Sequence, residues 1–175
     1  MRKLLNEELN RKSVDEFRNA SKTPIIIVLD NVRSLNNVGS VFRTSDAFLV
    51  EAVYLCGITG TPPNKDIQKT ALGSTDSVCW KHFKTTIDAV GVLKQNNYKV
   101  YSVEQAQSSI MLNNFYPEKG QKLAIIFGNE VKGVDQEVIN ASDDVIEIPQ
   151  VGTKHSINIA VSVGIVTWDL FQKML

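Results

Sequence analysis

Residues 24–29 read PIIIVL, an uninterrupted apolar run with three consecutive isoleucines and a valine. β-branched residues favour strands, and a strand that is apolar at every position has to be covered on both of its faces. Strands of this kind occur almost only in parallel sheets that carry helices on both sides. This run therefore predicts a buried strand over residues 23–30, and it constrains the fold more than any other segment.

Strand-like and helix-like segments alternate along most of the remaining sequence. This alternation predicts an α/β fold with a mainly parallel sheet and helices on both faces. Residues 4–20 contain a few apolar side chains among many charged ones, which predicts one or two short helices outside the main core. The other strands are expected over residues 52–58, 77–83, 98–103, 121–128 and 144–149, and the helices over 37–49, 66–73, 85–97, 135–141 and 156–175.

The domain organisation is simple. A chain of 175 residues is long enough for one domain with a substantial core, and 43% hydrophobic with 22% charged residues is ordinary for a globular protein. No internal repeat, low-complexity tract or linker interrupts it. We therefore divide the sequence into a short helical extension, residues 1–22, and one domain, residues 23–175.

Composition also narrows the class of protein. The formal net charge is zero, which argues against a non-specific polyanion binder but leaves room for a local basic patch. No apolar run approaches the roughly 20 residues that span a membrane, and the amino terminus lacks the apolar region of a secretory signal. Cys56 and Cys79 form no CxxC motif, so no disulfide is expected. We expect a cytoplasmic protein.

Common cofactor motifs are missing. The ten glycines never occur as GxG, and neither a GxxxxGK[ST] loop nor a GxSxG motif is present. The two histidines, His82 and His155, are far apart and show no metal-ligand spacing. We therefore expect no metal.

Polar loops follow three of the expected strands. Ligands bind open α/β sheets outside the carboxyl ends of the strands, so residues 30–43, 128–134 and 150–158 are the candidate site. Four cations lie in such loops and could bind a polyanion along one rim of a neutral protein. They are Arg33, Lys65, Lys132 and Lys154.

Each loop also has a purely structural interpretation. Glycines allow tight turns, and Ser156 is a natural N-cap for the last helix. Glu130 taken alone could be a solvated charge, and Arg43 an ordinary surface residue. The functional interpretation depends on all three loops together.

The polar residues of these loops form three spaced motifs. The first is N-x-G-x-x-x-R-T, the second is F-G-x-E-x-x-G, and the third is an Ile-Pro pair followed by S-I-N, with isoleucine where leucine is usual. Together they resemble the motifs of the SpoU/TrmH family of RNA ribose methyltransferases in the SPOUT superfamily. The matching residues are Asn37, Gly39, Arg43, Thr44, Phe127, Gly128, Glu130, Gly133, Ile148, Pro149, Ser156, Ile157 and Asn158.

The resemblance implies a fold and a cofactor. The expected fold carries a deep trefoil knot in its carboxyl-terminal part, which sequence physics alone would not suggest because knots are rare. The expected methyl donor is S-adenosylmethionine, held largely by backbone groups of the knotted loops. The residues that the resemblance places around it are Gly128, Ile148 and Ile157, with Val103 at the end of a neighbouring strand.

The resemblance also implies partners. The expected substrate is tRNA or rRNA, and the expected assembly is a homodimer with the last helix at its interface. On that helix Ala160 and Gly164 form a small-xxx-small face, which allows close packing either against a second copy or against the chain's own sheet. Many relatives carry an extra RNA-binding domain, whereas this chain has only residues 1–22 before the expected domain.

The implied reaction transfers a methyl group to a ribose 2′-hydroxyl. An arginine normally keeps its proton, so we expect Arg43 to hold the hydroxyl and a phosphate and to stabilise the developing oxyanion; its use as the base remains an alternative. Asn37 would fix its loop, and Glu130 would orient Arg43 or bind RNA. Ser156 and Asn158 would hold the third loop and the hydroxyl region. Asn36 is expected at the RNA, and the helix start near Val38 and Gly39 is expected to attract a phosphate.

Two other functions remain open from the sequence. The chain could bind RNA on the same fold without catalysis, although every polar motif residue is intact. It could also methylate a base nitrogen, although the N-x-G-x-x-x-R-T motif favours ribose chemistry.

Overall fold

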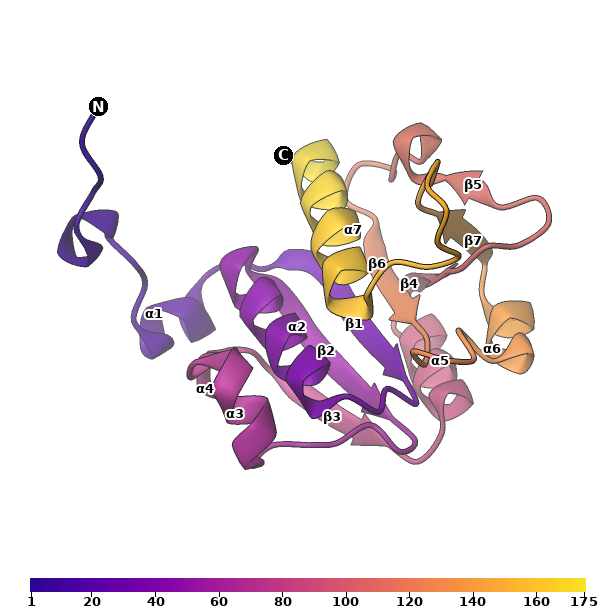
Figure 1. Ribbon diagram of the computed structural model, residues 1–175, viewed down its shortest axis with the longest axis horizontal. Helices are drawn as coiled ribbons and strands as arrows, with labels where there is room; N and C mark the ends of the chain where they lie inside the picture. Colours follow the sequence, from indigo (N-terminus) through magenta and orange to yellow (C-terminus); the bar gives the residue numbers. More distant parts are fainter.

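Seven parallel strands form one sheet at the centre of the molecule (Figure 1), in a computed structural model that describes residues 1–175 apart from the side chain of Asn6. The strand order is β3-β2-β1-β6-β4-β7-β5, and every neighbouring pair runs parallel. This confirms the parallel sheet predicted from the sequence. The strands are β1 (Thr23–Asp30), β2 (Val50–Cys56), β3 (Trp80–Phe83), β4 (Tyr98–Val103), β5 (Ile110–Met111), β6 (Lys122–Phe127) and β7 (Asp144–Glu147).

Helices cover both faces of the sheet. Within the described residues, no helix combines the length and the apolar character that crossing a membrane requires. The α-helices are α1 (Val14–Asn19), α2 (Leu35–Ala47), α3 (Lys65–Ala71), α4 (Ser74–Ser77), α5 (Thr86–Gln95), α6 (Gln136–Ala141) and α7 (Ile159–Met174), and two short 3₁₀ turns are η1 (Asn6–Leu9) and η2 (Leu112–Asn114).

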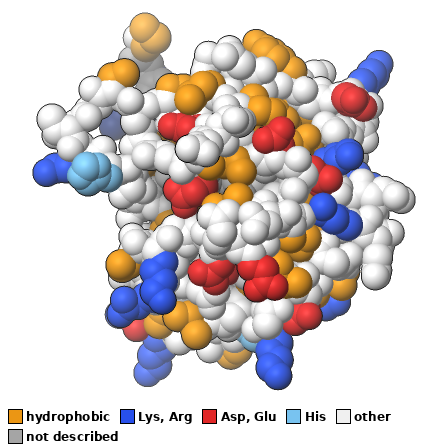
Figure 2. All heavy atoms as spheres, turned by 90° about the vertical axis from the view of Figure 1, so that its right-hand side faces the viewer, with side chains coloured by type: hydrophobic (Ala, Val, Ile, Leu, Met, Phe, Trp, Pro, Cys, Tyr) orange, Lys and Arg blue, Asp and Glu red, His pale blue; other side chains and the backbone are white. Residues whose placement is uncertain are grey.

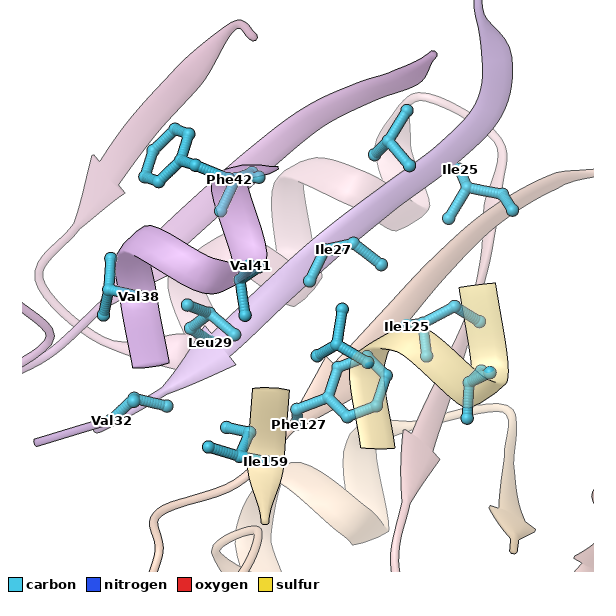
Figure 3. Close-up of a cluster of buried hydrophobic side chains, with 14 of the residues drawn as sticks. Ile25, Ile27, Leu29, Val32, Val38, Val41, Phe42, Ile125, Phe127 and Ile159 are labelled. Carbon is cyan, nitrogen blue, oxygen red and sulfur yellow. The ribbon is translucent and has the colours of Figure 1, made fainter. Parts of the chain in front are cut away.

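Strand β1 contributes to two separate cores. Ile25, Ile27 and Leu29 belong to the cluster that contains α2 and α7, and Figure 3 shows Leu29 beside Val38 and Val41 of α2. Ile26 and Val28 face the opposite side of the sheet, where they pack with α5 and α6. Because side chains alternate across a strand, only an apolar residue at every position can supply both cores. The uninterrupted run in the sequence therefore has this structural cause.

Helix α2 begins two residues earlier than the sequence pattern predicted. Its N-cap is Ser34, whose hydroxyl oxygen accepts a hydrogen bond from the amide of Asn37, the residue at the predicted start of the helix, at 3.3 Å. Serine and asparagine are nearly equivalent as caps, and sequence spacing does not decide between them. The consequence is that the Asn37 side chain is free to bond outside its own helix.

The last helix begins later than predicted, at Ile159. Its N-cap is Asn158, whose side-chain oxygen accepts hydrogen bonds from the amides of Ala160 at 2.9 Å and Val161 at 3.4 Å. Ser156 is therefore not the cap that we predicted. It lies exposed in the loop that leads to the helix.

Two small elements escaped sequence analysis. Strand β5 has two residues and helix α4 has four, which is too short for a period of 2 or 3.6 to be recognised. Part of the segment expected as a strand over 77–83 instead ends α4, and β3 begins only at Trp80. The remaining elements differ from the predicted ranges only at their ends.

We expected the amino-terminal extension to lie outside the core, but part of it is buried there. The Phe17 side chain of α1 is only 4% exposed and belongs to the cluster that contains α2 and α7. The guanidinium of Arg18 donates a hydrogen bond to the Asp76 carbonyl at 2.6 Å. These two contacts attach α1 to the main body beside α4.

Candidate functional site

A cleft of about 700 Å³ opens at the carboxyl ends of β4, β6 and β7. Its walls include Val103 after β4, Gly128 after β6, and Ile148 and Ile157 in the segment after β7. These are the four residues that the sequence resemblance predicted around a cofactor, and the fold brings all four to one cavity. Their cofactor role stays a prediction, but their common location follows from the parallel sheet, whose carboxyl ends meet at one edge.

The loop between β6 and α6 forms a turn that is held by several hydrogen bonds. The backbones of Asn129 and Gly133 exchange two hydrogen bonds of 2.9 Å, and the Asn129 side chain accepts further bonds from the amides of Val131 and Lys132. A Cβ atom on Gly128 would collide with the backbone of Gly133 and Val134. Only glycine therefore lets the two ends of this turn come so close, which explains the motif residue at position 128.

Glu130 projects from this turn to the beginning of α2. Its carboxylate accepts hydrogen bonds from the backbone amides of Arg33 and Ser34, each at 3.0 Å, and from the side-chain amide of Asn37 at 3.1 Å. A carboxylate at a helix N-terminus is favourable because it satisfies free amides and opposes the helix dipole. Glu130 thus joins the second motif to the first.

The charge state of Glu130 reflects these contacts. Burial raises its pKa, but the hydrogen bonds from the amides of Arg33 and Ser34, from its own backbone and from Asn37 outweigh burial. The pKa of Glu130 consequently lies below the usual glutamate value. The carboxylate is therefore ionised at neutral pH and stabilised as an anion.

The third motif joins the same network through Asn158. The Asn158 side-chain amide donates a hydrogen bond of 3.3 Å to the side-chain oxygen of Asn37, which in turn donates to Glu130. The beginnings of α2 and α7 and the turn after β6 are therefore connected by consecutive side-chain hydrogen bonds. The structure brings Asn37, Glu130 and Asn158 together, as their joint assignment to one site predicted.

Two expected roles at this point need correction. Glu130 makes its contacts with the beginning of α2, and among the residues that the structure describes no hydrogen bond or ion pair joins it to Arg43. The beginning of α2 was also expected to attract a phosphate. The Glu130 carboxylate already lies there, and it supplies the negative charge that a bound phosphate would have supplied.

Arg43 lies on the outer side of α2, away from the cleft. Its side chain is exposed and shares a face with Ser40 and Ala47, as the helical spacing predicted. These residues line a hollow of about 480 Å³ together with Thr70. No hydrogen bond or ion pair of the Arg43 guanidinium occurs with any described residue, so its donors are available to a ligand.

The expected RNA-binding cations are dispersed. Lys132 lines the cleft, and the exposed residues Arg33 and Asn36 flank the cap of α2. Lys65 begins α3 and Lys154 belongs to the exposed segment 150–156, both outside the cleft. Figure 2, which views the side of the molecule that carries β5, β7 and α6, shows acidic groups near the middle of this face and most cations toward its periphery.

Two further carboxylates line the cleft and were missed by sequence analysis. Glu104 accepts hydrogen bonds from the amides of Gln105 at 2.9 Å and Val134 at 3.1 Å, and Glu147 accepts one from the Ser109 hydroxyl at 2.5 Å. Each follows or ends a strand at its carboxyl end, which was the available signal. With Glu130 they give the cleft an acidic rim, which suits a cationic organic molecule.

A metal is not supported by the side chains. Within the part of the chain that the structure describes, no group of three or more His, Cys, Asp or Glu residues could hold a metal ion. Cys56 is buried, and burial raises its pKa to about 12, so its thiol stays protonated. The site therefore consists of hydrogen-bonding groups, carboxylates and an exposed arginine.

Sequence comparison identifies related proteins. Residues 24–168 match the profile of the SpoU rRNA Methylase family. The 23S rRNA (guanosine-2′-O-)-methyltransferase RlmB of Vibrio parahaemolyticus is 26% identical over 170 residues, which are 97% of this chain and 67% of that protein. The chain spans between 58% and 67% of the length of the first curated relatives that it matches.

Solved structures share the fold. The S-adenosylmethionine-bound rRNA methyltransferase of Sinorhizobium meliloti superimposes with a TM-score of 0.81 at 24% identity, covering 91% of this chain and 60% of that one. The TrmH/SpoU tRNA-modifying enzyme of A. aeolicus gives a TM-score of 0.80 at 22% identity, covering 91% of this chain and 80% of that one. The seven-stranded parallel sheet is thus that of the knotted α/β fold, as the resemblance predicted.

Proposed function

This chain belongs to the SpoU rRNA methylase family, and from that premise we propose that it transfers a methyl group from S-adenosylmethionine to a ribose 2′-hydroxyl of tRNA or rRNA. The observation that carries the proposal is the hydrogen-bonded chain Asn158–Asn37–Glu130, which ties the three motif loops together beside one cleft. The three motif loops are far apart in the sequence, yet their side chains share hydrogen-bonding partners. The V. parahaemolyticus relative, which is described as a 2′-O-methyltransferase, supports the ribose as the acceptor.

The cleft fits the proposed cofactor in size and chemistry. A volume of about 700 Å³ lies within the range of about 300–1,000 Å³ that holds small organic ligands. Val103, Ile148 and Ile157 provide apolar walls, and the carboxylates of Glu104 and Glu147 offer negative charge to a cation. When bound there, S-adenosylmethionine supplies an electrophilic methyl group on a positively charged sulfur.

Arg43 is the proposed catalytic residue. Its exposed guanidinium can donate several hydrogen bonds to a ribose hydroxyl and a neighbouring phosphate, and its positive charge stabilises the oxygen as the proton leaves. Small neighbours, Ser40 and Ala47, leave room for the ribose on the same face of α2. Direct proton abstraction by Arg43 is the alternative, which would need a deprotonated guanidinium and is therefore unfavourable.

The other polar motif residues act mainly on position. Asn37, Glu130 and Asn158 hold the loops through the bonds described above, while Ser156 lines the open part of the cleft and is able to contact the substrate. Lys132 at the cleft and the outlying Arg33, Asn36, Lys65 and Lys154 would contact RNA phosphates. Each phosphate contact contributes a salt-dependent share of affinity.

A homodimer through α7 is part of the proposal. Val161, Ile165 and Trp168 lie at helical spacing on the exposed side of this helix, and Trp168 is 52% exposed. A Cβ atom on Gly164 would meet nothing within 4 Å, so the small face of the helix is open rather than packed on its own sheet. An exposed apolar stripe of this kind is typical of an interface between copies.

Dimerisation would also explain the position of Arg43. In one chain Arg43 lies outside the cofactor cleft, but its hollow includes Phe48, whose ring packs against Trp168 at 5.7 Å between centroids. A second copy docked on α7 would therefore lie next to Arg43. We propose that the arginine of one copy acts on a methyl group held by the other.

The proposed activity is tested by assaying methyl transfer from labelled S-adenosylmethionine to RNA from cells that lack this gene. Nuclease digestion and mass spectrometry of the product should give a ribose-methylated nucleoside. A methyl group on a base nitrogen would instead support the second rival. Binding of RNA and cofactor with no transfer would support the non-catalytic RNA-binding protein.

A further inference from the structure

A hollow of about 570 Å³ lies between the amino-terminal extension and the outer side of α2. One wall is formed by residues 9–14 together with Phe17, and the other by Arg43, Ala47 and the segment 71–74. The hollow is separate from the cofactor cleft, with which it shares no residue. Its volume lies within the range that holds small organic ligands.

The wall that the extension forms is anchored to the domain. The Ser13 hydroxyl accepts a bond from the Glu16 amide at 3.2 Å and the Glu16 carboxylate accepts one from the Ser13 amide at 2.7 Å, which together fix the start of α1. Phe17 is buried in the core, and Arg18 is bonded to the Asp76 carbonyl. Arg11 and Lys12 directly precede this fixed turn, so both cations are held at the hollow.

The lining has the chemistry of a nucleotide site. Arg11, Lys12 and Arg43 supply three positive charges, and the Asp46 carboxylate is partly engaged by the Ser77 hydroxyl. Leu9, Val14 and Leu49 supply apolar surface in the same cavity. Cations beside an apolar surface match a phosphate that is attached to a sugar and a planar base.

The hollow continues past the proposed catalytic residue. Arg43 and Ala47 also line the smaller hollow on α2, where Lys69 and Thr70 of α3 form the other side. The two hollows therefore meet at Arg43, with cations at both ends. An extended strand of RNA could pass through both with one ribose at the arginine.

We propose that the larger hollow binds a nucleotide of the RNA substrate that flanks the methylated one, with Arg11 and Lys12 on its phosphate. This inference rests on the proposed function, because RNA reaches the hollow only if Arg43 works on RNA. The extension then forms part of the substrate site and contributes to the selection of RNA.

The test removes the two charges in R11A/K12A and compares the variant with K84A/K119A. The control removes the same net charge from exposed lysines that line neither hollow. Binding of unmodified tRNA transcripts and of a mixed-sequence single-stranded 12-mer RNA is measured by fluorescence anisotropy over a range of salt concentrations. R11A/K12A should weaken binding about tenfold or more at low salt and lower the slope of log K against log salt by about 1.4, which corresponds to two lost phosphate contacts on a single strand.

A second variant, V14W, fills the larger hollow without changing its charge, at a residue that does not line the hollow on α2. It should weaken RNA binding while the salt slope stays at the wild-type value, because the phosphate contacts on Arg11 and Lys12 are not removed. Calorimetry with S-adenosylmethionine and thermal melts establish that both variants keep the cleft and the fold. A structural defect would lower all these quantities together.

The outcomes separate the two proposals. If wild type binds RNA and R11A/K12A matches K84A/K119A in affinity and salt slope, the hollow is not an RNA site, while the proposed function stands. If wild type binds neither RNA, both the hollow and the proposed function are contradicted. Weakened binding in R11A/K12A and V14W, with the control unchanged, supports the flanking-nucleotide site.

Discussion

The side-chain amide of Asn158 donates a hydrogen bond of 3.3 Å to the side-chain oxygen of Asn37, joining residues 121 positions apart in the sequence. Asn158 caps α7 and Asn37 lies in the first turn of α2, so this bond connects the beginnings of the two helices. Glu130 accepts the next bond in the series and adds the turn after β6. The stability and the geometry of the site should therefore depend on these three residues together.

Replacing Glu130 by glutamine should loosen the site. Glutamine keeps the shape but offers one acceptor oxygen in place of two, so at least one of the donors from Arg33, Ser34 and Asn37 loses its partner. We expect the melting temperature to fall by about 2–4 °C, as the loss of roughly one hydrogen bond implies for a chain of this size, and cofactor affinity to fall with it. Differential scanning calorimetry and titration with S-adenosylmethionine measure both. E118Q, at an exposed loop, should melt like wild type.

The contribution of Glu130 should depend on pH in a defined direction. Its pKa is lower in the folded chain than the usual value of about 4.3, so folding favours the ionised form. The stability difference between wild type and E130Q should be full at pH 7. It should shrink as the pH falls below about 4.3 and disappear below the folded pKa. Urea unfolding at a series of pH values measures the difference, and a constant gap would contradict an electrostatic origin.

Replacing Arg43 by alanine should abolish methyl transfer without harming the fold. The side chain is exposed, so stability should change by less than about 0.5 kcal/mol. The transfer rate should fall at least about 100-fold because stabilisation of the developing oxyanion is lost. Cofactor binding should be unchanged. R43K should recover only part of the rate, since lysine keeps the charge but not the planar set of donors. Near-wild-type turnover in R43A would remove Arg43 from the mechanism.

Replacing Trp168 by glutamate should convert the proposed dimer into a monomer. The exposed indole lies at the carboxyl-terminal end of the apolar stripe on α7, and a buried unpaired carboxylate there opposes association. Analytical ultracentrifugation measures the change, and I58E provides the control because it changes an exposed apolar residue elsewhere. A wild-type chain that sediments as a monomer would refute the α7 interface.

Mixing two inactive variants should restore activity if Arg43 acts across the dimer. R43A lacks the arginine, and I157W places a bulky ring in the cofactor cleft that Ile157 lines. After exchange of subunits, half of the dimers are mixed and each contains one intact pair of sites, so about a quarter of the wild-type rate should return. Each variant assayed alone supplies the baseline. No recovery in demonstrably mixed dimers would indicate that Arg43 works within its own chain.

Much of the fold could be predicted from the sequence because local pattern and tertiary role agree. Residues 24–29 are apolar at every position because β1 lies between two cores. This apolar pattern can be recognised from the sequence without a structure. The helical stripe of α2 with Val38 and Val41 is equally local, and so is the outward direction of Arg43. Elements of two to four residues, such as β5 and α4, could not be predicted because they are shorter than the periods that reveal strands and helices.

The candidate site divides along the same line. The sequence by itself determined which residues stand at the carboxyl ends of strands, since spacing and polarity are local properties. Only the tertiary structure decided their partners: Glu130 holds the beginning of α2 and not Arg43, and Asn158 rather than Ser156 caps α7. Hydrogen bonds have a short range, so they form between whichever groups the packing of distant segments brings within about 3 Å. Packing also placed Arg43 between the extension and α3, outside the cofactor cleft. The distance between Arg43 and the cofactor cleft could not be predicted from any local sequence pattern.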